Sequence, residues 1–107
     1  METTELRSAA RRRLDHRYAS AAVSTEQLRA RPHTGWVRAV RDALGMSTRQ
    51  LATRMGVAQA TVVQMERSEA FETIQLATLR RAADALDCDL IYALVPRNGS
   101  LQHAVNA

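Results

Sequence analysis

Residues 47–66 read STRQLATRMGVAQATVVQME, a pattern that is typical of two helices joined by a tight turn. Helices that cross at a steep angle need a small side chain where their backbones approach, and Ala52 supplies it. The turn needs a residue that tolerates a positive φ, which Gly56 does. Apolar side chains at helical spacing are expected to fill the wedge between the helices: Leu51, Met55, Val57, Val62 and Met65. The stretch therefore predicts a helix-turn-helix motif.

The polar side chains of the second helix of this motif are expected to point outward, where a DNA major groove would lie. The amide of Gln59, at the start of that helix, can pair with adenine N6 and N7, which is worth about 1–3 kcal/mol of discrimination. The residues expected to read bases are Gln59, Ala60, Thr61, Val63 and Gln64. Phosphate contacts are expected from Thr48, Arg49 and Arg67. The alternative, that these are ordinary solvent-facing helix residues, stays open.

The charge of the chain favours an anionic partner. Its formal net charge is +4, and all 15 basic residues are arginine. Residues 1–41 hold nine arginines against four acidic residues, whereas residues 68–107 hold three against five. The basic excess thus precedes and surrounds the motif, as a phosphate-binding surface would require. A solvated arginine-rich helix from a GC-rich genome is the alternative interpretation.

Other function classes find little support in the 107 residues. The sequence has no run of about 18 apolar residues and no apolar segment near its start, so we expect a cytoplasmic protein without a membrane span. The single cysteine, Cys88, excludes an internal disulfide. The histidines His16, His33 and His103 are scattered and are expected at the surface, so no zinc ligand set, cofactor or catalytic constellation is expected. We do not expect an enzyme.

Apolar periodicity predicts further helices on both sides of the motif. Side-chain caps are expected from Ser24 with Gln27, from Thr34, and from Ser47 with Gln50. Trp36 is expected to anchor the core. The predicted helices cover residues 4–18, 24–31, 35–44, the two motif helices with the second ending near residue 67, and a last helix that begins at 73 or 74.

Residues 88–95 read CDLIYALV, which predicts a strand buried on both faces that ends before Pro96. A lone strand exposes unpaired backbone groups, so it needs a partner. A second copy of the chain is the favoured partner, through Leu90, Ile91, Tyr92, Ala93 and Leu94. A hairpin with the tail after Asn98-Gly99 is the alternative.

Residues 35–87 resemble the phage-repressor (Cro or XRE) family of helix-turn-helix proteins. The resemblance implies that Gln59, Ala60 and Gln64 read bases, that Thr48 contacts phosphate, and that Arg41 and Glu66 form an internal ion pair. This chain departs from the family pattern at two places. Ala58 stands where the family has a capping Ser or Thr, and Arg67-Ser68 stand where it often has Asn-Gly.

Four stretches are similar to the mobile mystery protein A family, namely RLDHR (13–17), GWVRAVRDALGM (35–46), MERSEA (65–70) and TLRRAADALDCDLIYALVP (78–96). Members of that family are small XRE-type proteins encoded beside a Fic-domain protein. The resemblance implies an antitoxin that binds a Fic-domain toxin partner and represses the shared operon. One known type of Fic inhibitor carries Glu followed by Gly or Asn, and no glutamate of this chain has either neighbour.

The expected fold is mainly α, a five-helix lambda-repressor-like domain at 34–87, with a helical arm at 1–33 and a dimerisation strand and tail at 88–107. The expected function is that of a dimeric repressor of double-stranded DNA operators. The alternative is a protein-interaction module that neutralises a toxin with little DNA role and uses the first helix as its binding arm.

Overall fold

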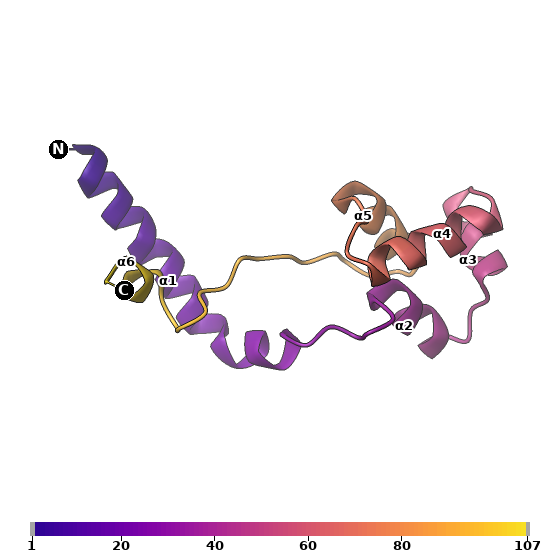
Figure 1. The fold of residues 1–107 in the computed structure, drawn as a ribbon, viewed down its shortest axis with the longest axis horizontal. Helices are drawn as coiled ribbons and strands as arrows, with labels where there is room; N and C mark the ends of the chain where they lie inside the picture. Colours follow the sequence, from indigo (N-terminus) through magenta and orange to yellow (C-terminus); the bar gives the residue numbers. More distant parts are fainter. Residues whose placement is uncertain (1, 107) are drawn as a thin grey trace. The chain divides into compact units, whose positions relative to one another are not determined.

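The computed structural model describes residues 2–106, apart from the side chains of residues 2, 22–25 and 27. Its described residues form six helices, as Figure 1 shows: α1 Glu2–Leu28, α2 Trp36–Ala43, α3 Thr48–Met55, α4 Gln59–Ala70, α5 Leu76–Ala85 and α6 Leu101–Asn106. Residue contacts divide the chain into two compact units. We call residues 31–91 the helical domain, and residues 1–30 with 92–107 the arm unit. No described helix is long and apolar enough to cross a membrane.

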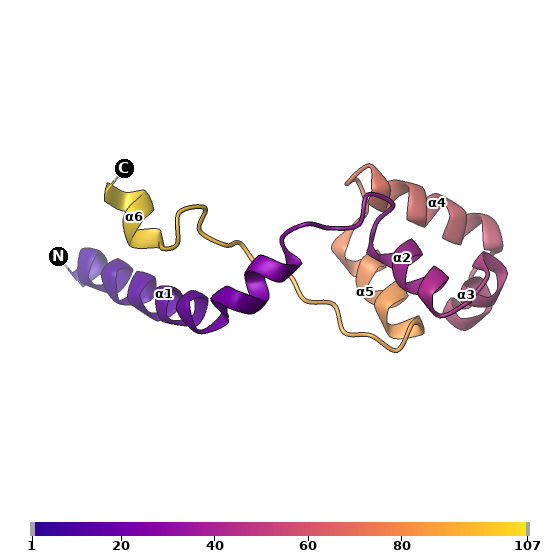
Figure 2. The same ribbon diagram turned by 90° about the horizontal axis from the view of Figure 1, so that it is seen from below.

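The helical domain contains four described helices, α2 to α5, where five were expected. Within it, α2 and α3 each contact both α4 and α5 (Figure 2). Leu51 and Val62 are fully buried at the centre, and burying one such side chain is worth about 1.5–3 kcal/mol. Gly56 has a φ of 70°, and Val57 N donates to Ala52 O at 3.0 Å, which closes the turn between α3 and α4. The predicted motif is therefore confirmed. The core of the helical domain consists of Val37, Met46, Leu51, Ala52, Val62, Met65, Ala82 and Leu86.

The helix starts of the domain are capped in different ways. The predicted capping box of α3 is confirmed, because Gln50 N donates to Ser47 Oγ at 3.1 Å and Ser47 N donates to Gln50 Oε1 at 2.8 Å. The predicted Thr34 cap of α2 is wrong. The N-cap residue is Gly35, without a side-chain hydrogen bond, and Glu69 of α4 accepts from the first amides of α2 instead. A carboxylate distant in sequence thus replaces a local hydroxyl.

α4 continues to Ala70, three residues beyond the predicted end at Arg67. Its last carbonyls accept from the Arg31 guanidinium, at 3.4 Å for Glu69 O and 3.2 Å for Ala70 O. The chain then turns at Glu72, whose φ of 61° lies in the left-handed region. A cation at the C-terminal end of a helix satisfies its free carbonyls and favours its dipole. This distant arginine stabilises a turn of helix where the local pattern predicted a loop.

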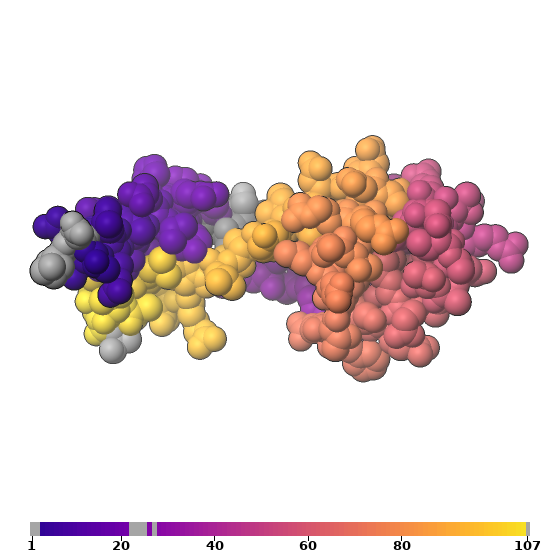
Figure 3. Space-filling view, turned by 90° about the horizontal axis from the view of Figure 1, so that it is seen from above, coloured from indigo at the N-terminus to yellow at the C-terminus, as the bar shows by residue number. Residues whose placement is uncertain are grey.

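The arm unit consists of α1 and the C-terminal α6, which contact each other (Figure 3). α1 is one continuous helix of 27 residues where two helices were predicted. Residues 2–28 contain no glycine or proline, so nothing in the backbone interrupts it. The predicted capping box of Ser24 with Gln27 lies outside the described side chains. Asp15 on α1 accepts from Leu101 N at 2.7 Å and Gln102 N at 3.3 Å, so it caps α6.

The predicted strand at 88–95 is wrong for the single chain, because this segment has no regular secondary structure and the described residues contain no strand. Its side chains are not buried on both faces, since Ile91 is 84% and Leu94 89% exposed. The hairpin alternative is also wrong, because the tail forms α6. A strand needs a ladder partner, and the described part of the chain supplies none.

Two predictions that a side chain is buried are also wrong. Cys88 is exposed, since the strand expected to bury it does not form. Trp36 is 41% exposed at the start of α2 instead of anchoring the core, which Val37 beside it enters. The three histidines are exposed, as predicted.

Candidate nucleic-acid interface

α4 presents one face to the core and the opposite face to solvent. Val62, Met65, Glu66 and Glu69 are buried at positions i, i+3, i+4 and i+7, the spacing of a single helix face. All five residues expected to read bases lie on the remaining, exposed surface: Gln59, Ala60, Thr61, Val63 and Gln64. The helix-turn-helix packing therefore leaves these side chains accessible to a partner.

Gln59 is held in place by the neighbouring helix. Its Nε2 donates to Oγ1 of Thr48, the first residue of α3, at 2.8 Å. A carboxamide has two N–H donors and one carbonyl oxygen, so one donor and the acceptor stay open after this bond. These are the two groups that a bidentate contact with adenine requires. The sequence predicted that Gln59 reads bases and that Thr48 contacts phosphate, and the structure shows that the two side chains are hydrogen-bonded to each other.

The phosphate-contact candidates lie on both motif helices. Thr48 is half-buried at the N-terminal end of α3, next to the exposed Arg49, and Arg67 is exposed on the last turns of α4. A shallow open groove of about 470 Å³ runs along α3 and is lined by Leu44, Gly45, Met46, Arg49, Gln50, Thr53 and Arg54. Two guanidinium groups thus border this groove, which favours anions over cations.

Arg41 and Glu66 form a buried ion pair between α2 and α4. Arg41 Nε lies 2.6 Å from Glu66 Oε2, and its Nη2 lies 3.0 Å from Oε1. Its Nη1 also donates to Met46 O at 2.8 Å, in the turn before α3. The hydrogen bond to Glu66 raises the pKa of Arg41 above its ordinary value. One guanidinium thereby fixes α4 relative to α2 and the start of α3.

Glu69 is a second buried carboxylate, and it was not among the residues predicted from the sequence. Its oxygens accept from Trp36 N at 2.7 Å and Val37 N at 2.9 Å. Gly35 makes room for it, because a Cβ there would lie 2.8 Å from Glu69 Oε1, and its φ is 92°. The available signal was a glutamate in the apolar stripe of α4, three residues after Glu66. A carboxylate on a buried face needs donors, and a helix N-terminus offers them.

α4 begins without a side-chain cap. Ala58 occupies the N-cap position with φ −72° and ψ 152° and makes no side-chain hydrogen bond. The extended backbone conformation is the one that a capping Ser or Thr would adopt. The helix that presents the base-reading candidates is thus held at its start by packing and by Gln59, not by a cap.

The remaining predicted site residues are the five expected to form the dimer, and they belong to neither α3 nor α4. Leu90, Ile91, Tyr92, Ala93 and Leu94 belong to the irregular segment after α5. Among the described residues, no group of three or more His, Cys, Asp or Glu side chains could hold a metal ion. The chemistry that α3 and α4 offer is recognition through amide, hydroxyl and guanidinium groups.

A protein-family model described as Helix-turn-helix matches residues 37–92, which is just over half of the chain. The matched range contains α2, α3, α4 and α5 together with the Arg41–Glu66 pair. No curated protein and no solved structure matches the sequence.

Proposed function

This chain belongs to the helix-turn-helix family, and we propose on that basis that it is a sequence-specific transcriptional repressor that reads DNA with α4. The family is one of DNA-binding regulatory domains rather than catalytic ones. The observation that carries the proposal is the exposed face of α4, where the amide of Gln59 is oriented by Thr48. The proposed base-reading residues are Gln59, Ala60, Thr61, Val63 and Gln64, and the proposed phosphate contacts are Thr48, Arg49 and Arg67.

A gel shift with the DNA upstream of the chain's own gene tests this function. At moderate salt, the protein should bind that DNA more tightly than random duplex. Gln59→Ala should reduce this preference, whereas Arg49→Ala should weaken binding to both DNAs and lower the salt dependence. Equal affinity of the unmodified chain for its own upstream DNA and for random DNA would contradict the proposal.

We propose further that the repressor acts as a homodimer joined through Leu90, Ile91, Tyr92, Ala93 and Leu94. Supporting this, Ile91, Tyr92 and Leu94 are 84%, 65% and 89% exposed in one chain, and the backbone of an irregular apolar segment can pair with a second copy. A two-fold axis would also match a palindromic operator. Sedimentation equilibrium should show a dimer that Ile91→Asp with Leu94→Asp converts to a monomer. A monomer at all concentrations of the unmodified chain would refute the dimer.

The cellular role that we propose is that of the antitoxin of a Fic-domain toxin, which represses the operon of the pair. Its support is the resemblance of four stretches, residues 13–17, 35–46, 65–70 and 78–96, to the mobile mystery protein A family. A Fic-domain reading frame beside the gene, and co-purification of its product with this chain, are expected. If neither is found, the chain is a regulator without that partner.

A further inference from the structure

The strongest charged surface outside the helix-turn-helix lies on α1. Five arginines fall within residues 7–17: Arg7, Arg11, Arg12, Arg13 and Arg17. Arg11 is half-buried and donates to Ser8 Oγ at 3.1 Å, whereas the other four are exposed. None of these four forms an ion pair with a carboxylate among the described residues. The helix therefore carries concentrated positive charge that the described part of the chain does not neutralise.

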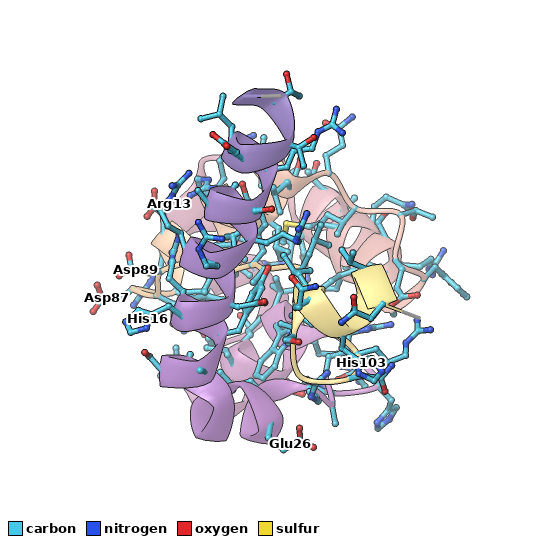
Figure 4. All side chains as sticks on the ribbon, turned by 90° about the vertical axis from the view of Figure 1, so that its left-hand side faces the viewer. Arg13, His16, Glu26, Asp87, Asp89 and His103 are labelled. Atoms are coloured by element: carbon cyan, nitrogen blue, oxygen red, sulfur yellow. The ribbon has the colours of Figure 1, made fainter. Side chains whose placement is uncertain are left out.

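Asp15, the acidic residue inside this cluster, is already engaged. Both of its carboxylate oxygens accept backbone N–H groups at the start of α6. Arg13 lies two residues before it, which places it about 200° around the helix. Figure 4 shows Arg13 and His16 projecting from the side of α1 that faces away from α6. Asp15 is thus occupied on one side of α1 by the capping of α6, and Arg13 and Arg17 are exposed on the other.

Arg13 and Arg17 share a helix face at positions i and i+4, where like charges repel and destabilise an isolated helix. A bound anion would attract both arginines and so offset their mutual repulsion. Arginine suits phosphate in particular, because its planar guanidinium can donate two parallel hydrogen bonds to one phosphate group. Such repulsion on an exposed helix is the expected mark of a surface that binds phosphates.

We propose that this face of α1, formed by Arg13 and Arg17, binds the phosphate backbone of duplex DNA as a second, sequence-independent contact. The inference rests on the proposed function only in taking DNA as the partner. A second copy of the chain is a poor occupant, because it would bring the same arginines. A protein groove is less favoured, because such interfaces depend on clustered aromatic or aliphatic anchors. The exposed leucines on this face, Leu6 and Leu28, are 22 residues apart along α1.

The test compares two doubly substituted full-length chains. Arg13→Gln with Arg17→Gln removes two charges from the proposed face, and glutamine retains a good helix propensity. Arg80→Gln with Arg81→Gln is the matched control, since both of these arginines are exposed on α5 and the net charge falls equally. Circular dichroism checks that both variants keep the helix content of the unmodified chain. Affinity for the upstream DNA and for random duplex is then measured over a range of salt concentrations.

Each lost phosphate contact should lower the slope of log affinity against log salt by about 0.9, so the α1 variant should lose about 2. Its affinity should fall by the same factor on both DNAs, while the α5 control keeps the original slope. An unchanged slope in the α1 variant, or an equal loss in the control, would overturn the inference. A normal slope combined with loss of a co-purifying protein would assign the face to that protein instead.

The same data separate this inference from the proposed function. If the unmodified chain shows no preference for its upstream DNA but the α1 variant has the reduced slope, the phosphate contact stands and the repressor proposal fails. If Gln59→Ala abolishes the preference while the α1 variant behaves as the unmodified chain, the repressor stands and the phosphate contact is refuted.

Discussion

At the scale of single residues, the candidate interface depends on polar side chains whose partners come from another helix. Gln59 is oriented by Thr48, Glu66 by Arg41, and Glu69 by the amides that follow Gly35. Each bond removes freedom from a side chain or a helix before DNA arrives. Binding then costs less conformational entropy, which is how preorganisation increases affinity.

Thr48→Val should weaken base discrimination, because it removes the hydroxyl that holds the Gln59 amide and leaves the size of the side chain unchanged. The preference for the upstream DNA over random duplex should fall several-fold, by about 1 kcal/mol. In a Gln59→Ala background the change should have no further effect on this preference, as a double-mutant cycle would show. Thr53→Val is the control, since its exposed hydroxyl bonds only to Arg49 O within α3. Equal losses of affinity on both DNAs would assign Thr48 to phosphate alone.

Glu69→Ala should lower the free energy of unfolding by about 3 kcal/mol, because the buried amide of Val37 and the part-buried amide of Trp36 lose a charged acceptor. Urea unfolding followed by circular dichroism measures this difference. The control, Glu72→Gln, removes an ion pair whose carboxylate is 74% exposed and should cost less than about 1 kcal/mol. A loss for Glu69→Ala as small as that of the control would show that water replaces the carboxylate at no cost.

At the scale of elements, the helices differ in what stabilises them. α3 has a complete local capping box, whereas α2 and α4 depend on side chains from elsewhere in the helical domain. α1 has little apolar contact of its own, and α6 is held to it by Asp15. α4, which presents the candidate base-reading residues, lacks a side-chain cap at Ala58, so its local stability can be increased.

Ala58→Ser should stabilise the helical domain by about 1 kcal/mol, because a serine hydroxyl at this N-cap can accept from the amides at the start of α4. The midpoint of urea unfolding should rise accordingly. Ala43→Ser, at the exposed end of α2, is the control and should change stability by less than about 0.5 kcal/mol. No gain over the control would mean that Gln59 and Thr48 prevent the serine from adopting the capping rotamer.

Asp15→Asn should release α6 without affecting the helical domain. Loss of the charged acceptor should speed hydrogen exchange at the amides of Leu101 and Gln102 by about tenfold. The exposed Asp89→Asn serves as the control, and the unfolding midpoint of the domain should stay the same in both variants. Unchanged exchange in the Asp15 variant would show that apolar contacts alone hold α6.

At the scale of the whole molecule, the two compact units differ in whether their described residues include a buried hydrophobic core. All residues of the hydrophobic core lie between Val37 and Leu86, inside the helical domain. The arm unit instead exposes arginines and several large apolar side chains, among them Leu6 and Leu28. The buried core of the described residues therefore lies in the domain that carries the candidate base-reading helix.

A fragment of residues 31–91 should therefore fold alone. It retains the whole core, both buried carboxylates and Arg31, so its unfolding midpoint in urea should match that of the full chain within error. Differential scanning calorimetry should show one cooperative transition for the fragment. A markedly lower midpoint would mean that the arm unit contributes to the stability of the domain.

The helix-turn-helix and its outward face follow from local features of the sequence. Leu51, Ala52, Gly56 and Val62 are constrained by local sterics and helical period, which a linear pattern records directly. The capping box of Ser47 and Gln50 was equally readable, because its partners lie three residues apart. The Arg41–Glu66 pairing came only through resemblance to a family, since nothing local relates two residues 25 positions apart.

The pairing of distant polar groups and the partners of whole segments depend instead on tertiary contacts. Glu69 accepts from Val37 N, 32 residues away in sequence, and Gln59 donates to Thr48, 11 residues away. Both hydrogen bonds depend on the way the helices cross. The apolar, partly β-branched composition of residues 88–95 predicted a strand, and that prediction is wrong for the single chain, because the described residues supply no strand to pair with it. Local propensity favours an extended conformation, but a strand forms only where another strand supplies hydrogen bonds to its backbone.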